Sequence, residues 1–157
     1  MKVEGSYRLT APRETVYKHL MNPDVLARAM PGCEKLTPNP DGSFSAEMKI
    51  GIAFAKGRYR GRVEVLDTLA PEHYRLKVEA QGAGGFVIGD GTLALTEDAG
   101  GTLIRYFGDA QVGGPIASVA QRLMAGAARQ MAQQFFEAFS KAIQQTQGDV
   151  GPTLGPA

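Results

Sequence analysis

The residues able to do acid–base or metal chemistry are few and scattered in this sequence. Among 157 residues there are two histidines, His19 and His73, and one cysteine, Cys33, all far apart. Metal sites and nucleophilic sites need such groups to converge. We therefore interpret both histidines as surface residues, and we expect no metal, no cofactor and no catalytic residue.

Two further features that could signal catalysis do not fit a known pattern. The glycine-rich segment GAGGFVIGDG, residues 82–91, has neither the dinucleotide-binding nor the P-loop spacing. It also lies between two predicted strands, where neither motif occurs. Asp90 and Asp109 are isolated acids, and we expect both in turns or on the outer face of a sheet.

A row of four cations stands out in the segment KGRYRGR. Their alternate spacing places them on one face of a strand, opposite Tyr59 and Gly61. One interpretation is a solvated face, partly neutralised by Glu47 and Glu79 on neighbouring strands. The other is contact with an acidic protein or with anionic lipid headgroups. The four residues are Lys56, Arg58, Arg60 and Arg62.

Composition narrows the classes of partner and compartment. The net charge is +1, so no global field attracts nucleic acid. No apolar run approaches the roughly 18 residues needed to span a bilayer, and the first residues lack the apolar core of a signal peptide. A single cysteine excludes an intramolecular disulfide and favours a reducing cytoplasm. We expect a cytoplasmic protein.

Hydrophobic periodicity predicts the elements that must position any site. A strand near residues 2–9 is followed by two short helices, 13–21 and 24–30, the second capped by Asn22. Six further strands then alternate apolar and polar residues as far as residue 112. A long apolar helix follows from Gly113. The prediction is an α+β domain over residues 1–146, with a disordered tail at 147–157.

The long helix is too apolar to be exposed, and the inner face of the sheet is its natural partner. We predict a curved antiparallel sheet of about seven strands wrapped around that helix. Glycines on the inner face and alanines on the helix remove side-chain volume, so we predict an apolar cavity between them. Its candidate lining is Met48, Tyr59, Val78, Tyr106, Ala120, Leu123, Met124, Ala127, Met131 and Phe135.

This order of elements resembles the START-like helix-grip superfamily, also called SRPBCC. Within it, three segments resemble the CoxG-like family, named after the G subunit of carbon monoxide dehydrogenase. They are MPGCEKL at 30–36, GDGTLAL at 89–95, and DAQVGGPIASVAQRLMAGAARQMAQQFF at 109–136. The resemblance covers residues 1 to about 145.

The resemblance implies a binding or adaptor role rather than catalysis. Members of the family are associated with molybdenum hydroxylases of the CO dehydrogenase type and with their recruitment to the membrane. The expected ligand is a lipophilic molecule, such as a quinone or a lipid, and the expected membrane contact is peripheral. Two alternatives stay open: a cyclase or hydratase that uses the same cavity, and a structural assembly factor with a filled core.

Overall fold

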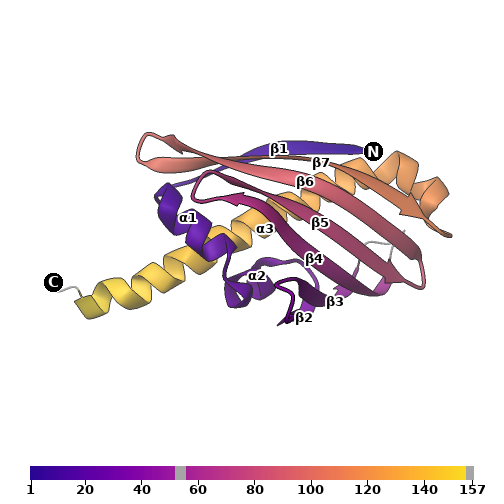
Figure 1. Cartoon of the computed structure of the whole chain (residues 1–157), viewed down its shortest axis with the longest axis horizontal. Helices are drawn as coiled ribbons and strands as arrows, with labels where there is room; N and C mark the ends of the chain where they lie inside the picture. Colours follow the sequence, from indigo (N-terminus) through magenta and orange to yellow (C-terminus); the bar gives the residue numbers. More distant parts are fainter. Residues whose placement is uncertain (52–55, 155–157) are drawn as a thin grey trace.

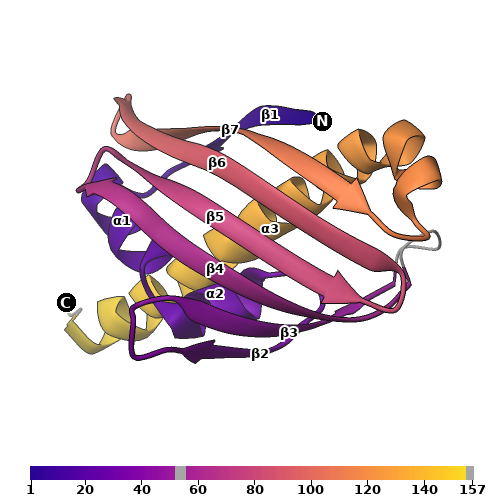
Figure 2. The same cartoon turned by 45° about the vertical axis from the view of Figure 1, so that its right-hand side comes forward.

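The protein is described by a computed structural model. It describes residues 1–51 and 56–154, apart from the side chains of residues 120, 121, 124 and 145–154. The chain forms one curved antiparallel sheet with a long helix lying diagonally across its concave face (Figures 1 and 2). This arrangement confirms the predicted fold class.

Seven strands make the sheet in the order β1-β7-β6-β5-β4-β3-β2, all antiparallel. Strands two to seven follow the chain as a meander, and β1 closes onto β7. Their bounds are β1 Lys2–Leu9, β2 Cys33–Pro38, β3 Phe44–Ile50, β4 Gly57–Leu69, β5 His73–Gly82, β6 Gly85–Asp98 and β7 Gly101–Gly113.

Two short helices, α1 Arg13–Leu20 and α2 Pro23–Ala29, join β1 to β2. The Asn22 side chain accepts a hydrogen bond of 3.0 Å from the backbone N–H of Asp24, which satisfies one of the unpaired donors at the start of α2. Pro23 occupies the first helical position, where its missing N–H costs nothing. The cap predicted from the sequence is therefore confirmed.

The long helix α3 spans Ala117–Leu154, so it begins four residues later than Gly113. Residues 113–116 instead belong to the end of β7 and a turn, in which Gly114 has a φ of 84°. The helix also continues through residues 147–154, which the sequence suggested would be disordered. Extending an existing helix adds one hydrogen bond per residue without a new nucleation cost. Residues 155–157 lie outside the described part.

The main core lies where the second half of α3 meets the sheet and the two short helices. Phe136, Phe139 and Ile143 of α3 are buried against Leu95 and Ile104 of the sheet. Aromatic rings dominate the contact: Tyr7 stacks on Phe136 with ring centroids 5.5 Å apart, and Phe135 stacks on Phe139 at 5.6 Å. This end of the sheet–helix interface is filled.

Candidate functional site

An apolar cavity of about 290 Å³ lies at the other end of the same interface, between β3–β6, the end of α2 and the first half of α3. Its lining consists of aliphatic, methionine, tyrosine and glycine residues. They are Met30, Ala46, Met48, Ile50, Tyr59, Gly61, Val63, Val78, Ala80, Val87, Ile116, Ala128 and Met131.

Small side chains in register explain why this space stays open. Ala46 of β3 pairs with Gly61 of β4, and Gly61 pairs with Ala80 of β5. A Cβ placed on Gly61 would find its nearest side-chain atoms 3.8 and 3.9 Å away, at the Cβ atoms of Ala80 and Ala46. Ala128 of α3 also lines the space. A row of the smallest residues thus lies across three strands and leaves volume unfilled.

Two other glycines of the inner face, Gly5 and Gly82, lie under a tyrosine ring instead. Gly5 lies under the Tyr106 ring, and Gly82 lies under Tyr59. A Cβ on Gly82 would come within 2.8 Å of Tyr59 Cδ2. Glycine therefore has two roles in this sheet: at Gly61 it contributes to the cavity, and at Gly5 and Gly82 it makes room for an aromatic ring.

Four of the ten predicted lining residues line the cavity: Met48, Tyr59, Val78 and Met131. Ala127 is half-buried, but the adjacent Ala128 is the residue in the lining. The side chains of Ala120 and Met124 lie outside the described part of the structure. The sequence prediction did not single out the remaining lining residues.

Three predicted residues are placed elsewhere. Tyr106 and Phe135 pack against the filled core, where Tyr106 approaches Phe136 with ring centroids 5.7 Å apart. Leu123 is 51% exposed and is not among the residues that line this cavity. It lies five residues from Ala128, which is about 140° of rotation at 3.6 residues per turn. Met131 of the predicted helix positions does line the cavity, and Ala128 is the other residue of α3 in the lining.

The cavity adjoins a surface cleft. That cleft, of about 250 Å³, lies between the turn after α2, the end of β3 and α3, and the two hollows share Ile50 and Met131. Lys49, Gln130 and Gln134 give the cleft a polar rim. An apolar chamber behind a polar rim is the usual form of a site for a small lipophilic molecule.

Acid–base groups are scarce in this site. In the described lining, Tyr59 is the one titratable side chain, and its hydroxyl is buried without a hydrogen-bond partner. No group of three or more His, Cys, Asp or Glu side chains gathers in the part of the chain that the structure describes.

Two groups outside the lining have a raised pKa. Burial raises the pKa of the Cys33 thiol, which keeps it in its unreactive protonated form. Burial also raises the pKa of Tyr74, which packs edge-on against Tyr17 in the filled core.

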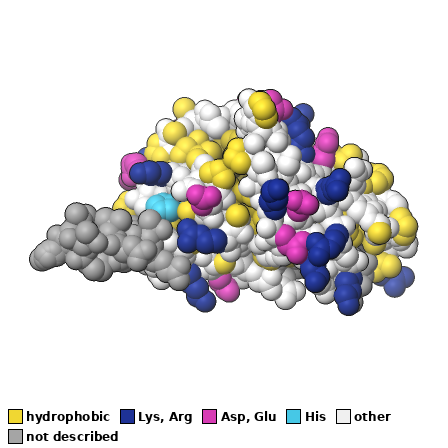
Figure 3. All heavy atoms as spheres, turned by 90° about the horizontal axis from the view of Figure 1, so that it is seen from below, with side chains coloured by type: hydrophobic (Ala, Val, Ile, Leu, Met, Phe, Trp, Pro, Cys, Tyr) yellow, Lys and Arg dark blue, Asp and Glu magenta, His cyan; other side chains and the backbone are white. Residues whose placement is uncertain are grey.

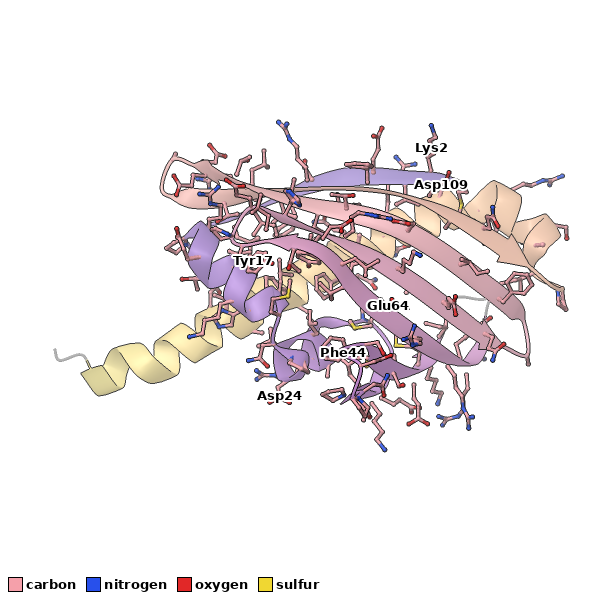
Figure 4. The ribbon with its side chains drawn as sticks, viewed as in Figure 1. Lys2, Tyr17, Asp24, Phe44, Glu64 and Asp109 are labelled. Atoms are coloured by element: carbon pink, nitrogen blue, oxygen red, sulfur yellow. The ribbon has the colours of Figure 1, made fainter. Side chains whose placement is uncertain are left out.

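The two isolated acids lie on the outer face of the sheet, as predicted. Asp90 accepts a hydrogen bond of 2.8 Å from Arg75. Asp109 accepts one of 2.9 Å from the N-terminal ammonium, and Lys2 lies opposite it on β1 (Figure 4). The ammonium group and Lys2 hold the pKa of Asp109 below its usual range. Neither carboxylate faces the cavity.

Arg58, Arg60 and Arg62 of the basic row lie on the outer side of β4, whose inner side lines the cavity, and Lys56 directly precedes that strand. Arg58 pairs with Glu34, and Arg62 pairs with Glu64 and, at 2.6 Å, with Asp41. Glu47 and Glu79 stand opposite Arg60 and Arg62 in the ladder, as predicted, but the ion pairs form elsewhere. Arg60 and Lys56 are exposed and have no ion-pair partner among the described residues.

Exposed apolar side chains accompany the unpaired Arg60. Arg60 lines a shallow outer groove of about 370 Å³ together with Phe86 and Ile88 of β6, whose side chains are both about half exposed. Elsewhere the surface mixes charges of both signs, as Figure 3 shows for one face. No helix in the described part of the chain is both long and apolar enough to cross a bilayer.

Comparison with known proteins supports the fold and gives the family. A conserved protein from Geobacillus kaustophilus is 34% identical, with a TM-score of 0.89 over 93% of this chain and 97% of that one. A START superfamily protein from Mycobacterium smegmatis has a TM-score of 0.70 at 12% identity, over 92% and 98% of the two chains. Among curated proteins, none matches this chain. The family model for CoxG, the G subunit of carbon monoxide dehydrogenase, matches residues 5–144. The chain therefore belongs to the CoxG family.

Proposed function

We propose that this protein is a non-enzymatic binding and adaptor protein whose cavity holds a lipophilic molecule, quinone-like or lipid-like. The observation that carries the proposal is the wholly apolar chamber left between α3 and β3–β6. Its volume of about 290 Å³ is near the lower end of the range for small-molecule sites. Each methylene transferred there from water contributes about 0.8 kcal/mol.

The adaptor part of the proposal concerns a CO-dehydrogenase-type molybdenum hydroxylase and its recruitment to the inner face of the membrane. Membership in the CoxG family supports this association. We assign the contact to the outer side of β4, where Lys56 and Arg60 are unpaired among the described residues, and where Phe86 and Ile88 are exposed nearby. Arginine and aromatic residues are enriched in protein interfaces, and basic groups attract anionic headgroups.

The two alternatives are less well supported. A cyclase or hydratase needs an acid or base within hydrogen-bond reach of its substrate, and Tyr59 is the one titratable group in the described lining. A neutral phenol is a poor base near pH 7. A purely structural assembly factor gives no reason for a row of small residues to leave this end of the interface unfilled.

Native mass spectrometry of the purified protein, followed by organic extraction, tests the proposal. We expect a fraction of the protein to carry an extra mass of a few hundred daltons, and we expect that molecule to partition into the organic phase. Protein stripped of it should take up a quinone analogue such as decylubiquinone. Protein that carries no such molecule and takes up no analogue would contradict the binding role.

A further inference from the structure

The Tyr59 ring spans the wall of the cavity and points toward the turn between β5 and β6. The side chain starts from β4, between Met48 of β3 and Gly82 of β5. A Cβ placed on Gly84 would lie 2.6 Å from the Tyr59 hydroxyl oxygen and 3.1 Å from Ile116 Cγ2. The hydroxyl therefore lies over Gly84, beside Ile116, which also lines the cavity.

This hydroxyl is an anomaly in an apolar wall. Tyr59 is only 7% exposed, and its hydroxyl has no hydrogen-bond partner among the residues that the structure describes. An unpaired buried polar group destabilises a fold, and such groups are rare in native proteins. Phenylalanine would fill the same space without that cost. A tyrosine held here at the expense of stability suggests that its hydroxyl has a partner in another state of the protein.

We propose that the Tyr59 hydroxyl is the specificity-determining donor of the cavity, which donates a hydrogen bond to a carbonyl oxygen of the bound molecule. This inference rests on the proposed function and deepens it. It names the ligand class as a lipophilic ketone or quinone, rather than a hydrocarbon chain alone. A carbonyl needs only a donor, and a neutral phenol supplies one.

The geometry also sets the orientation of the ligand. In this arrangement the carbonyl end lies beside Ile116, and the apolar part extends along the row Ala46, Gly61 and Ala80. The hydroxyl is buried beside Ile116, so the proposal requires the Ile116 side chain to change its rotamer when a ligand binds.

Two ligands and two variants test the inference. Decylubiquinone carries carbonyl oxygens, and decylbenzene has the same alkyl length without oxygen. Equilibrium dialysis gives the Kd of each for the wild type, Tyr59→Phe, and the control Tyr106→Phe at the filled end of the interface. We expect Tyr59→Phe to weaken decylubiquinone about 3- to 10-fold and leave decylbenzene unchanged, with the Tm of the free protein unchanged or raised. Tyr106→Phe should change neither Kd.

The other outcomes distinguish a failure of the Tyr59 donor role from a failure of the proposed binding function. Unchanged decylubiquinone affinity in Tyr59→Phe, while the wild type binds both ligands, would overturn the donor role and leave the proposed function intact. An equal loss for both ligands would assign Tyr59 a packing role and would also overturn the inference. If the wild type bound neither ligand, the proposed function itself would fail, and this inference with it.

Discussion

The two ends of the sheet–helix interface use the same backbone pattern but differ in side-chain volume. At one end, Phe136, Phe139 and Ile143 of α3 fill the space against the sheet. At the other, Ala128 and Met131 face the small residues of β3–β5 across the cavity. Ala128, Met131, Phe139 and Ala142 follow a single stripe of α3 at helical spacing. The difference teaches that one amphipathic helix can supply both the stability of the fold and its binding site.

The largest effect should come from emptying the filled end. Phe139 is fully buried, so Phe139→Ala removes a large contact and leaves a cavity. We expect a loss of about 3–5 kcal/mol in the free energy of unfolding, measured by urea denaturation. Phe107 on the outer face is 60% exposed, and Phe107→Ala should cost less than about 0.5 kcal/mol. Similar losses for the two variants would contradict the assignment of the core.

The same substitution at both ends gives the sharpest contrast. Ala142 is buried in the filled core, so Ala142→Phe should overpack it and cost about 1–3 kcal/mol. Ala128→Phe should be nearly neutral for stability, because the ring enters empty space, but it should abolish uptake of decylubiquinone. Thermal unfolding and dialysis measure the two effects. A destabilised Ala128→Phe variant that still binds the analogue would show that the cavity is not at this position.

A smaller effect should appear on the outer side of the strand that lines the open end. Arg60→Glu should weaken binding to vesicles containing phosphatidylglycerol about fivefold or more at low salt, because each basic group near an anionic surface contributes about 1 kcal/mol. The effect should shrink as salt screens the charges. Arg105→Glu makes the same charge change on exposed β7 and serves as the control. Vesicle sedimentation measures the binding. Equal effects of the two variants would favour the interpretation that the basic row is only a solvated face.

The smallest effect concerns Asp41, whose carboxylate in the β2–β3 turn pairs with Arg62 of β4. Hydrogen bonds from Ser43, followed by the Arg62 guanidinium, lower the pKa of Asp41 to about 2. A lowered carboxyl pKa adds stability above the unfolded-state value of about 4, and that stability disappears as the pH falls from about 4 to about 2. Asp41→Asn should therefore lower Tm by roughly 3 °C or less at pH 6. The Tm difference from wild type should shrink as the pH falls from about 4 to about 2 and vanish below that; a constant difference would contradict the assignment.

Alternation made most of the fold predictable from the sequence. The sheet has the seven antiparallel strands that alternation predicts, and Asn22 caps α2 as expected. These features depend on local periodicity and local hydrogen bonds, which the sequence records directly. The resemblance carried by residues 30–36, 89–95 and 109–136 also led to the correct family.

The candidate site was less predictable, because it depends on the phase and position of α3 on the sheet. Ala128 rather than the adjacent Ala127 lines the cavity, and Leu123 is exposed, whereas Met131 lies where the sequence predicts. The sequence also could not show that a tyrosine ring covers Gly5 and Gly82 but not Gly61. Ion-pair partners raised the same difficulty, because long side chains reach beyond the directly opposite residue. Arg58 of β4 reaches over β3 to pair with Glu34 of β2.

The most direct test of the open end uses the filled end as its internal control. Methyl NMR of protein labelled at Ala, Ile, Val and Met can follow a titration with decylubiquinone. We predict shifts at Val78, Ile116, Ala128 and Met131, which line the cavity, and none at Ile104 and Ile143, which are buried in the filled core. Shifts confined to the filled core, or to Ile88 on the outer face, would contradict the central claim that the cavity is the binding site.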